Sequence, residues 1–229
     1  MRNGHEHWHL GLFSWNMKLI KKKGYYSGEV WEFNLPAGHS CPYACKCLTQ
    51  ADRQTGKQTS GEQRTFRCYA ASAERFPAVR SNRWANFEAL KEMKSEKEMY
   101  VALFQMFTGK ESAVRIHGSG DFFNQRYFNA WVLICQLMPE VEFWAFTKSI
   151  PYWVNCEYSI PSNFTLTASR GSSRDHLIDK HQLKNCEVFL TSKDAVTSGL
   201  PIDTDDTLAR ESATNFALVD NYERKKKVN

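Results

Sequence analysis

The sequence has no apolar run that approaches the roughly 18 residues of a membrane-spanning helix. Residues 1–7 carry charge and histidine where a secretory signal peptide would have its apolar stretch. Low-complexity linkers and internal repeats are also absent. These absences exclude a membrane-spanning helix, and they predict a single domain over residues 1–229 in the cytoplasm.

The chain has instead the composition of a protein with a large core. Of its 229 residues, 42% are hydrophobic and 14% are aromatic, which excludes a disordered chain. The formal net charge of +5 is concentrated near the two ends, in residues 21–23 and 223–227. We therefore interpret residues 1–29 as an N-terminal extension and residues 220–229 as a basic tail of one α/β domain.

Seven cysteines are present, and four of them lie close together in the sequence. These clustered cysteines are Cys41, Cys45, Cys47 and Cys68. The polar residues 48–66, which separate the last two, are predicted to be an exposed insertion. The remaining cysteines lie in apolar or helical contexts, where free cysteine usually packs as a small buried hydrophobic residue.

The clustered cysteines have three explanations. Disulfides suit small secreted domains, whereas this chain is long and rich in core residues. A structural zinc site usually has two pairs of closely spaced ligands, and Cys68 has no such partner nearby. An iron–sulfur cluster needs three or four thiolates from a loop and accepts irregular spacing. The spacing therefore favours a [4Fe-4S] cluster with all four cysteines as metal ligands, ahead of zinc and of disulfides.

Basic residues surround these cysteines. Between Cys41 and Phe87, eight lysines and arginines stand against three acidic residues. Such positive charge would offset the negative charge of a thiolate-ligated cluster and help to keep the thiols deprotonated. The same charge is typical of a nucleic-acid-binding surface, so a zinc-stabilised nucleic-acid-binding module stays open as an alternative.

Six apolar segments predict strands, at residues 30–35, 113–116, 141–146, 164–168, 187–190 and 216–219. Helical patterns lie between most of them, and the later strands recur about every 25 residues, as in the βα units of a parallel sheet. Because six units are fewer than the eight of a closed barrel, we expect a partial (β/α)6 TIM-like barrel. A doubly wound sheet is the alternative.

In parallel α/β folds, the residues that follow the strands meet at one edge of the sheet, where active sites lie. That edge receives the cysteine loop and six candidate cofactor-binding residues: Gly118, Ser119, Gly120, Asp121, Lys148 and Arg170. The two glycines would let a ligand approach the backbone, or they form a plain turn. Asp121 would bind a ligand amine or cap the following helix. Lys148 and Arg170 would bind a carboxylate or a phosphate.

Several motifs of the chain resemble the gene product 88 family of bacteriophage proteins. They lie between residues 33 and 218 and comprise Leu35-Pro-Ala-Gly-His-Ser-Cys-Pro42, Arg67-Cys-Tyr-Ala70, Arg75-Phe-Pro-Ala-Val-Arg80, His117-Gly-Ser-Gly-Asp-Phe-Phe123, Ala145-Phe-Thr-Lys-Ser149 and Leu166-Thr-Ala-Ser-Arg-Gly171. The resemblance implies a phage-encoded protein that acts in the cytoplasm of the host cell.

The order of the parts is also similar, more distantly, to that of radical S-adenosylmethionine enzymes. In that family three cysteines hold a four-iron cluster, and the remaining iron binds the methionyl group of the cofactor. The similarity implies that Cys68 is the last cluster ligand and that residues 118–121 face the methionyl amine. The chain departs from the C-x3-C-x2-C spacing of that family, and a fourth thiolate would leave no open iron.

Three functions follow, in order of preference. The first is a phage-encoded iron–sulfur protein with a redox or accessory metabolic role, whose partner is a small molecule or a redox protein. The second is a radical S-adenosylmethionine enzyme that uses three of the cysteines and binds its cofactor near Gly118, Gly120 and Asp121. The third is the zinc-stabilised nucleic-acid-binding module. The sequence leaves open whether the protein is an enzyme, and none of the three functions involves a membrane.

Overall fold

The strands expected from the apolar segments are all present in the computed structural model of the chain, which describes residues 19–22 and 30–220. Most are short runs rich in apolar side chains, as expected for parallel strands that are covered on both faces. The parallel strands are β2 (Val30–Asn34), β5 (Ala113–Ser119), β6 (Glu142–Thr147), β7 (Phe164–Ser169), β8 (Asn185–Phe189) and β9 (Phe216–Val219).

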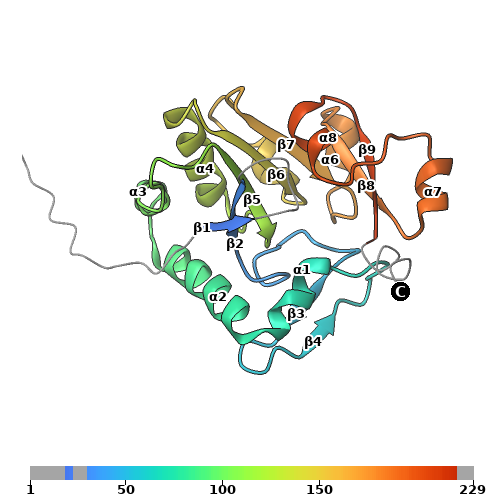
Figure 1. The fold of residues 1–229 in the computed structure, drawn as a ribbon, viewed down its shortest axis with the longest axis horizontal. Coiled ribbons are helices and arrows are strands. Elements are labelled where there is room, and N and C mark those ends of the chain that lie inside the picture. The colour runs from blue at the N-terminus through green and yellow to red at the C-terminus, as the bar shows by residue number, and fades with distance from the viewer. Residues whose placement is uncertain (1–18, 23–29, 221–229) are drawn as a thin grey trace, which may run out of the picture.

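These strands belong to one seven-stranded sheet with the order β1-β2-β5-β6-β7-β8-β9 (Figure 1). The edge strand β1 (Leu19–Lys22) pairs antiparallel with β2, and every later pairing in this sheet is parallel. The strands therefore follow one another in chain order, and the sheet has no point at which the order reverses.

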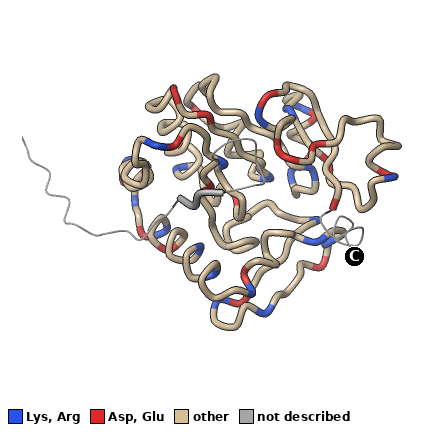
Figure 2. Tube along the Cα trace, viewed as in Figure 1, with Lys and Arg blue, Asp and Glu red and all other residues tan. Residues whose placement is uncertain are grey.

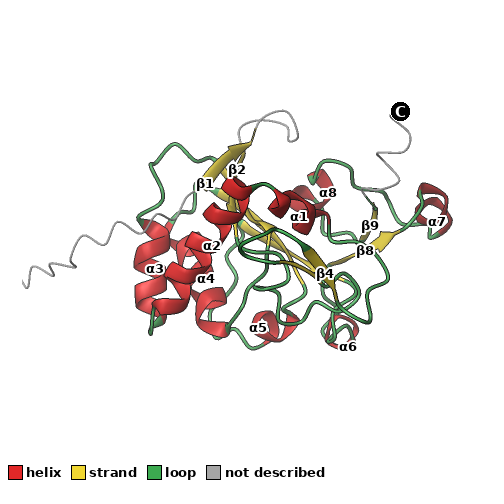
Figure 3. Ribbon diagram, turned by 90° about the horizontal axis from the view of Figure 1, so that it is seen from below, coloured by secondary structure: helices red, strands yellow, loops and turns green. Residues whose placement is uncertain are grey.

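One face of the sheet carries the main hydrophobic core. Because side chains alternate along a strand, the register places Phe33, Ile116, Ala145 and Leu166 side by side on this face. All four are buried in the same core cluster. Three helices cover them, α2 (Pro77–Glu92), α3 (Glu96–Phe104) and α4 (Gln125–Leu137), which Figure 3 shows grouped together beside the sheet.

The opposite face of the sheet is partly polar. The register places Glu32, Arg115, Trp144 and Thr165 side by side there. A smaller apolar cluster that includes Trp144 packs beneath α8 (Thr207–Glu211) on this face. The sheet thus separates an apolar side, which faces the long helices, from a polar side, which faces the candidate site.

The longer helices begin at residues that favour helix starts. Pro77 is the first residue of α2, where its fixed φ suits the helix and its missing N–H is not needed. Ser95 precedes α3, and its hydroxyl accepts a hydrogen bond from Glu98 N. The remaining helical segments are short: α1 (Tyr69–Ser72), the 3-10 helix η1 (Ala73–Arg75), α5 (Ile150–Val154), α6 (His176–Lys180) and α7 (Ser192–Thr197).

The six-stranded parallel sheet confirms the predicted α/β class, but the partial (β/α)6 TIM-like barrel is not shown. The edge strands β1 and β9 do not pair with each other, so the described sheet is open. Closing a sheet into a barrel requires enough tilted strands to complete the circle, and eight is the usual number. The doubly wound alternative is not supported either, because its strand order reverses at a switch point.

Residues 48–66 contain the short strands β3 (Thr49–Ala51) and β4 (Gln58–Ser60), which form a separate antiparallel hairpin. Many of its residues are exposed, although Thr49 and Ala51 are buried. Of the predicted N-terminal extension 1–29 and basic tail 220–229, residues 1–18, 23–29 and 221–229 lie outside the described part. Among the described residues, no helix has the length and apolar character needed to cross a bilayer.

Candidate functional site

The cysteine loop follows β2 and is fastened to two strand ends. The backbone N–H and the hydroxyl of Ser40 both donate to Pro36 O, at 3.1 and 2.8 Å. Farther along, the N–H groups of Cys45 and Lys46 donate to Gly171 O, at 3.2 and 3.1 Å. Since Gly171 lies just beyond β7, the loop crosses from the end of β2 to the end of β7.

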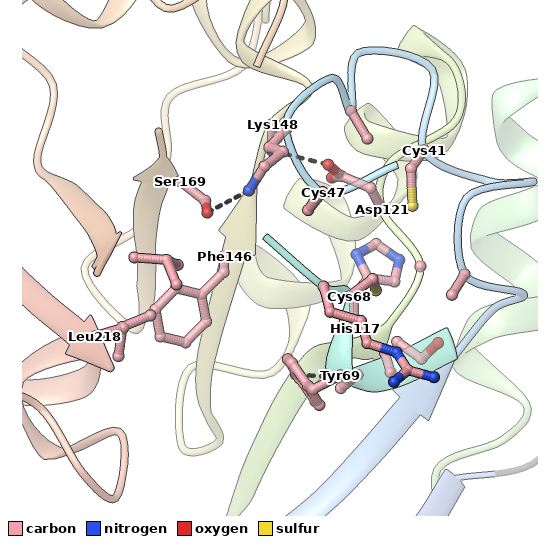
Figure 4. A pocket seen from close by; sticks show the side chains of 18 of the residues that line it. Cys41, Cys47, Cys68, Tyr69, His117, Asp121, Phe146, Lys148, Ser169 and Leu218 are labelled. Carbon is pink, nitrogen blue, oxygen red and sulfur yellow. Dashed lines mark hydrogen bonds between the residues drawn. The ribbon is translucent and has the colours of Figure 1, made fainter. Parts of the chain in front are cut away.

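This loop forms part of the wall of a cavity of about 530 Å³ at the carboxyl edge of the sheet (Figure 4). Three of the clustered cysteines, Cys41, Cys47 and Cys68, line the cavity. Cys45 does not, because its thiol is turned toward the surface and donates to Gln63 Oε1 at 2.7 Å. The structure therefore brings three of the four predicted ligands to one cavity and separates the fourth.

The environments of Cys41 and Cys68 favour the protonated form of each thiol. Burial raises the pKa of Cys41 well above its ordinary value, and negative charge at Asp121 and Cys68 raises it further, against a backbone hydrogen bond from Gly38. Burial also raises the pKa of Cys68, followed by the charge of Cys47. At Cys41 and Cys68, burial therefore outweighs the effect of basic neighbours on the pKa. A metal would have to displace their protons.

Within residues 19–22 and 30–220, no three His, Cys, Asp or Glu side chains gather closely enough to hold one metal ion. A structural zinc ion needs four ligands that meet at one point, about 2.0–2.3 Å from the metal. The thiolates of a four-iron cluster instead bind separate iron atoms, so they surround a volume rather than meet at one ion. Cys41, Cys47 and Cys68 share one cavity without meeting at one point.

Gly118, Ser119 and Gly120 also line the cavity, but the glycines serve the packing of the protein itself. A Cβ at Gly118 would collide with the Glu32 carboxylate, and one at Gly120 would collide with Ser40 Oγ. Gly120 also has a φ of +87°, which favours glycine. For Gly118 and Gly120, a plain turn is therefore favoured over a role in ligand binding. Ser119 is only 2% exposed, and its Oγ has no hydrogen-bond partner among the described residues.

Asp121 lines the same cavity and joins the loop after β5 to the end of β6. Its Oδ1 accepts from the Thr147 hydroxyl at 2.6 Å, and its Oδ2 accepts from the Lys148 N–H at 2.8 Å. Burial raises the pKa of Asp121, while these donors oppose the increase. The helix-cap explanation is wrong, because Asn124 occupies the cap position of α4 and its side chain accepts a backbone hydrogen bond there.

The two candidate cations lie in different surroundings. Lys148 is buried in the cavity wall, where its Nζ donates to Ser169 Oγ at 2.5 Å. Burial lowers the pKa of Lys148, but the negative charge of Cys47 and three further acidic groups outweighs that effect, so the pKa is raised. Arg170 lies outside the cavity and forms an ion pair with Asp179 at 2.6 Å. Of these two predicted cations, only Lys148 is therefore placed to contact a ligand in the cavity.

The sequence reasoning missed a polar network on the sheet side of the cavity. Arg115 pairs with Asp206 at 3.1 Å and donates to the Tyr69 hydroxyl at 3.1 Å, which in turn donates to Gly118 O at 2.9 Å. Tyr69 is 49% exposed, yet the burial of its hydroxyl end raises its pKa to about 12. The sequence contains one signal that could have revealed this network, namely the charged residues Glu32 and Arg115 within otherwise apolar strands.

Two of the eight basic residues around the cysteines, Arg80 and Arg83, are occupied by the protein itself, whereas Lys46, Arg53, Lys57, Arg64 and Arg75 are exposed. Arg80 is buried and donates to the backbone carbonyls of Arg53 and Gln54, both at 2.8 Å. Arg83 is buried and pairs with Glu74 at 2.9 Å. Figure 2 shows acidic residues interspersed with the basic ones around α2 and the β3–β4 hairpin. Arg80 and Arg83 are therefore not available to contact phosphates.

Comparison with known proteins gives one match. A protein-family profile described as gene product 88 matches residues 11–228. No curated protein and no solved structure matches the chain, and the similarity to radical S-adenosylmethionine enzymes is not shown by any of these comparisons. The matched residues include the cysteine loop, the cavity and every parallel strand. The chain therefore belongs to the gene product 88 family of bacteriophage proteins.

Proposed function

We propose that this protein binds an iron–sulfur cluster in the cavity, with Cys41, Cys47 and Cys68 as its ligands. The observation that carries the proposal is that these three thiols line one cavity, although two separate segments supply them. Cys41 and Cys47 belong to the loop after β2, and Cys68 directly precedes α1. A bound cluster supplies one-electron redox chemistry at this position.

Two features of the cavity wall suit a thiolate-ligated cluster. The Gly38 N–H points at Cys41 Sγ, 3.3 Å away, and hydrogen bonds to sulfur are one means by which proteins stabilise such clusters. Lys148 as a whole residue is 8% exposed, so its positive charge is only weakly screened by water. Both features favour the negative charge that three thiolates bring to the cavity.

The strand order supports the same placement. We interpret the six parallel strands, which follow one another without reversal, as an arc of a β/α barrel. The long helices then cover the outer face, and the cavity lies at the carboxyl ends of the strands on the inner face. This is the edge at which enzymes with that architecture hold their cofactors.

The proposal is tested by reconstituting the full-length protein with iron and sulfide under anaerobic conditions. We expect about four iron and four sulfide per chain, with the broad visible absorbance of a thiolate-ligated cluster. Cys41→Ser, Cys47→Ser and Cys68→Ser should each lose most of the iron. Cys45→Ser is the matched control and should retain it, because Cys45 does not line the cavity.

Each outcome of this experiment decides a different point. A colourless wild-type protein, or retention of iron by all three cavity variants, would contradict the proposal. Loss of iron in Cys45→Ser would contradict the three-ligand assignment and favour ligation by four cysteines. Far-UV circular dichroism of each variant should match that of the wild type, which separates the loss of a ligand from the loss of the fold.

We further propose, as a second candidate, that the protein is a radical S-adenosylmethionine enzyme. The observation that favours it is the outward position of Cys45, because three cysteines leave one iron of a four-iron cluster without a protein ligand. Gly118 and Asp121 line the same cavity as the three cysteines. A cluster held by Cys41, Cys47 and Cys68, once reduced by an external one-electron donor, would supply the electron that breaks a carbon–sulfur bond of the S-adenosylmethionine sulfonium.

The second candidate predicts a spectroscopic change. When S-adenosylmethionine is added to the reduced, reconstituted protein, the electron paramagnetic resonance signal of the cluster should change, both in the wild type and in Cys45→Ser. The same addition of S-adenosylhomocysteine controls for a general effect of nucleoside binding. An unchanged signal would exclude the second candidate and leave the cluster-binding proposal intact.

A further inference from the structure

Lys148 is a buried cation that forms no ion pair with a carboxylate among the described residues. Its side chain lies in the cavity wall, and its Nζ donates to the neutral hydroxyl of Ser169 at 2.5 Å. The Asp121 carboxylate accepts a hydrogen bond from the backbone N–H of Lys148, not from its ammonium group. In the part of the chain that the structure describes, no carboxylate forms an ion pair with this ammonium group. Buried charges in proteins are normally paired, so this position favours an anion from outside the chain.

A second polar group lines the cavity at the neighbouring strand end. Ser119 is the last residue of β5, Lys148 follows β6, and Ser169 is the last residue of β7, so the three lie at the ends of adjacent strands. The Ser119 hydroxyl is buried and has no partner among the described residues. A hydroxyl can donate to an anion, and a buried one without a partner carries an energetic cost.

The cavity beside Lys148 has an apolar wall. Phe146 is the last residue but one of β6, and its side chain lines the cavity as Lys148 does. Val188 and Leu218 are direct neighbours in the β8–β9 register, and all three apolar side chains line the cavity. Figure 4 shows Phe146 and Leu218 close together, on the side of the cavity away from Cys41. A ligand here would meet a cation at one end and apolar side chains at the other.

We propose that this part of the cavity binds a small molecule that has one carboxylate group and an apolar body. Lys148 and Ser119 hold the carboxylate. Phe146, Val188 and Leu218 contact the apolar body. A single ammonium group with hydroxyl neighbours matches a singly charged carboxylate better than a doubly charged phosphate. None of these five residues is a proposed metal ligand, so the inference goes beyond the proposed cluster, with which it shares only the positive charge of Lys148.

The experiment compares carboxylates with amides of the same shape. Butyrate and benzoate, each beside butyramide or benzamide, are titrated into the full-length, metal-free, reduced protein, and dissociation constants are measured by ligand-observed NMR. We expect the wild type to bind each carboxylate about 10- to 100-fold more tightly than its amide, the range of a charge-assisted hydrogen bond. Lys148→Met should reduce that preference to below about twofold, because the carboxylate then has no ammonium group to contact and loses its advantage over the amide.

Two matched variants separate contact from general effects. Arg170→Met removes a positive charge outside the cavity and should keep the preference for carboxylates. Leu218→Ala should weaken the binding of carboxylate and amide alike. Equal affinity of the wild type for both members of each pair, or no saturable binding of either carboxylate, would overturn the proposal. Loss of the preference in Arg170→Met would also overturn it. Iron content is measured separately, so failure of the carboxylate site and failure of the cluster are distinguishable.

Discussion

His117 occupies a bulge at the end of β5. The pairing of β2 with β5 passes from Ile116 to Ser119 at this point, which leaves His117 and Gly118 outside the regular ladder. His117 has a φ of +69°, a conformation that is costly for a residue with a side chain. Its Nε2 lies 2.8 Å from the Tyr127 hydroxyl on α4, so the bulge turns the imidazole toward the core.

We expect His117 to make the stability of the protein depend on pH. Burial lowers the pKa of His117 to about 3, whereas an unfolded histidine has a pKa of about 6.5. As the pH falls, the unfolded chain therefore binds this proton first. The contribution of His117 to stability is complete above about pH 6.5 and is lost toward about pH 3, by about 1.4 kcal/mol per pH unit.

The measurement is urea unfolding of the wild type and of His117→Gln at about pH 7.5 and about pH 5. Between these values the free energy of unfolding of the wild type should fall by about 2 kcal/mol more than that of the variant. His181→Gln, at an exposed position, should follow the wild type. The same pH dependence in His117→Gln and in the wild type would show that the buried imidazole does not titrate as described.

At the scale of elements, the cysteine loop depends on the segment of α1, η1 and α2. Glu74 in η1 accepts from the Ala37 N–H in the cysteine loop at 2.7 Å and from Arg83 in α2 at 2.9 Å. Arg83 also donates to Ala70 O in α1 at 2.8 Å. Glu74 is fully buried, so one ion pair joins the loop that carries Cys41 to the segment that carries Cys68.

Removing the Glu74 carboxylate should destabilise the protein strongly. Glu74→Ala leaves the buried Arg83 without its counter-charge, and we expect the free energy of unfolding to fall by about 3–5 kcal/mol in urea titrations. Glu88→Ala is the matched control, because Glu88 pairs with Arg53 at the surface, where both side chains are more than 40% exposed. Its effect should stay below about 1 kcal/mol.

Two results would contradict this assignment of Glu74. One is a similar loss of stability in Glu74→Ala and Glu88→Ala. The other is a Glu74→Gln variant that is no more stable than Glu74→Ala. Glutamine keeps an oxygen acceptor for the Ala37 N–H, so Glu74→Gln should retain more stability than Glu74→Ala. Because the glutamine variant changes the structure least, it also provides the measurement if the alanine variant does not fold.

At the scale of the whole molecule, the sheet brings distant parts of the chain to one cavity. Cys41 and Leu218 line the same cavity from opposite ends of the described chain. Arg115 on β5 pairs with Asp206, just before α8, and Trp144 Nε1 donates to the same carboxylate at 3.0 Å. This follows from the parallel pairing of β2 and β5 to β9, because these six strands all end at the same edge of the sheet.

Much of this architecture could be predicted from local patterns. Short apolar runs that recur about every 25 residues indicate parallel strands, and those runs became β2 and β5 to β9. The placement of the cysteine loop and of residues 118–121 at one edge follows from the same pattern. The short strands β3 and β4 were not predicted, because runs such as Gln58–Ser60 have no apolar periodicity.

Within the candidate site, neighbours in sequence have different surroundings. Cys45 and Cys47 are two residues apart, yet only Cys47 lines the cavity. Ser169 and Arg170 are adjacent, yet only Ser169 contacts Lys148 in the cavity. No spacing rule distinguishes these pairs, because side-chain directions in a loop depend on the segments against which the loop packs.

The sequence by itself determined the class of the fold, the number of parallel strands and the residue types that gather at their carboxyl edge. These properties are local, since they depend on which short segments are apolar and on the residues that follow them. Only the tertiary structure decided that the sheet stays open, that three thiols share one cavity and that Lys148 rather than Arg170 faces it. These properties depend on contacts between distant segments, such as the Gly171 carbonyl that holds the N–H groups of Cys45 and Lys46.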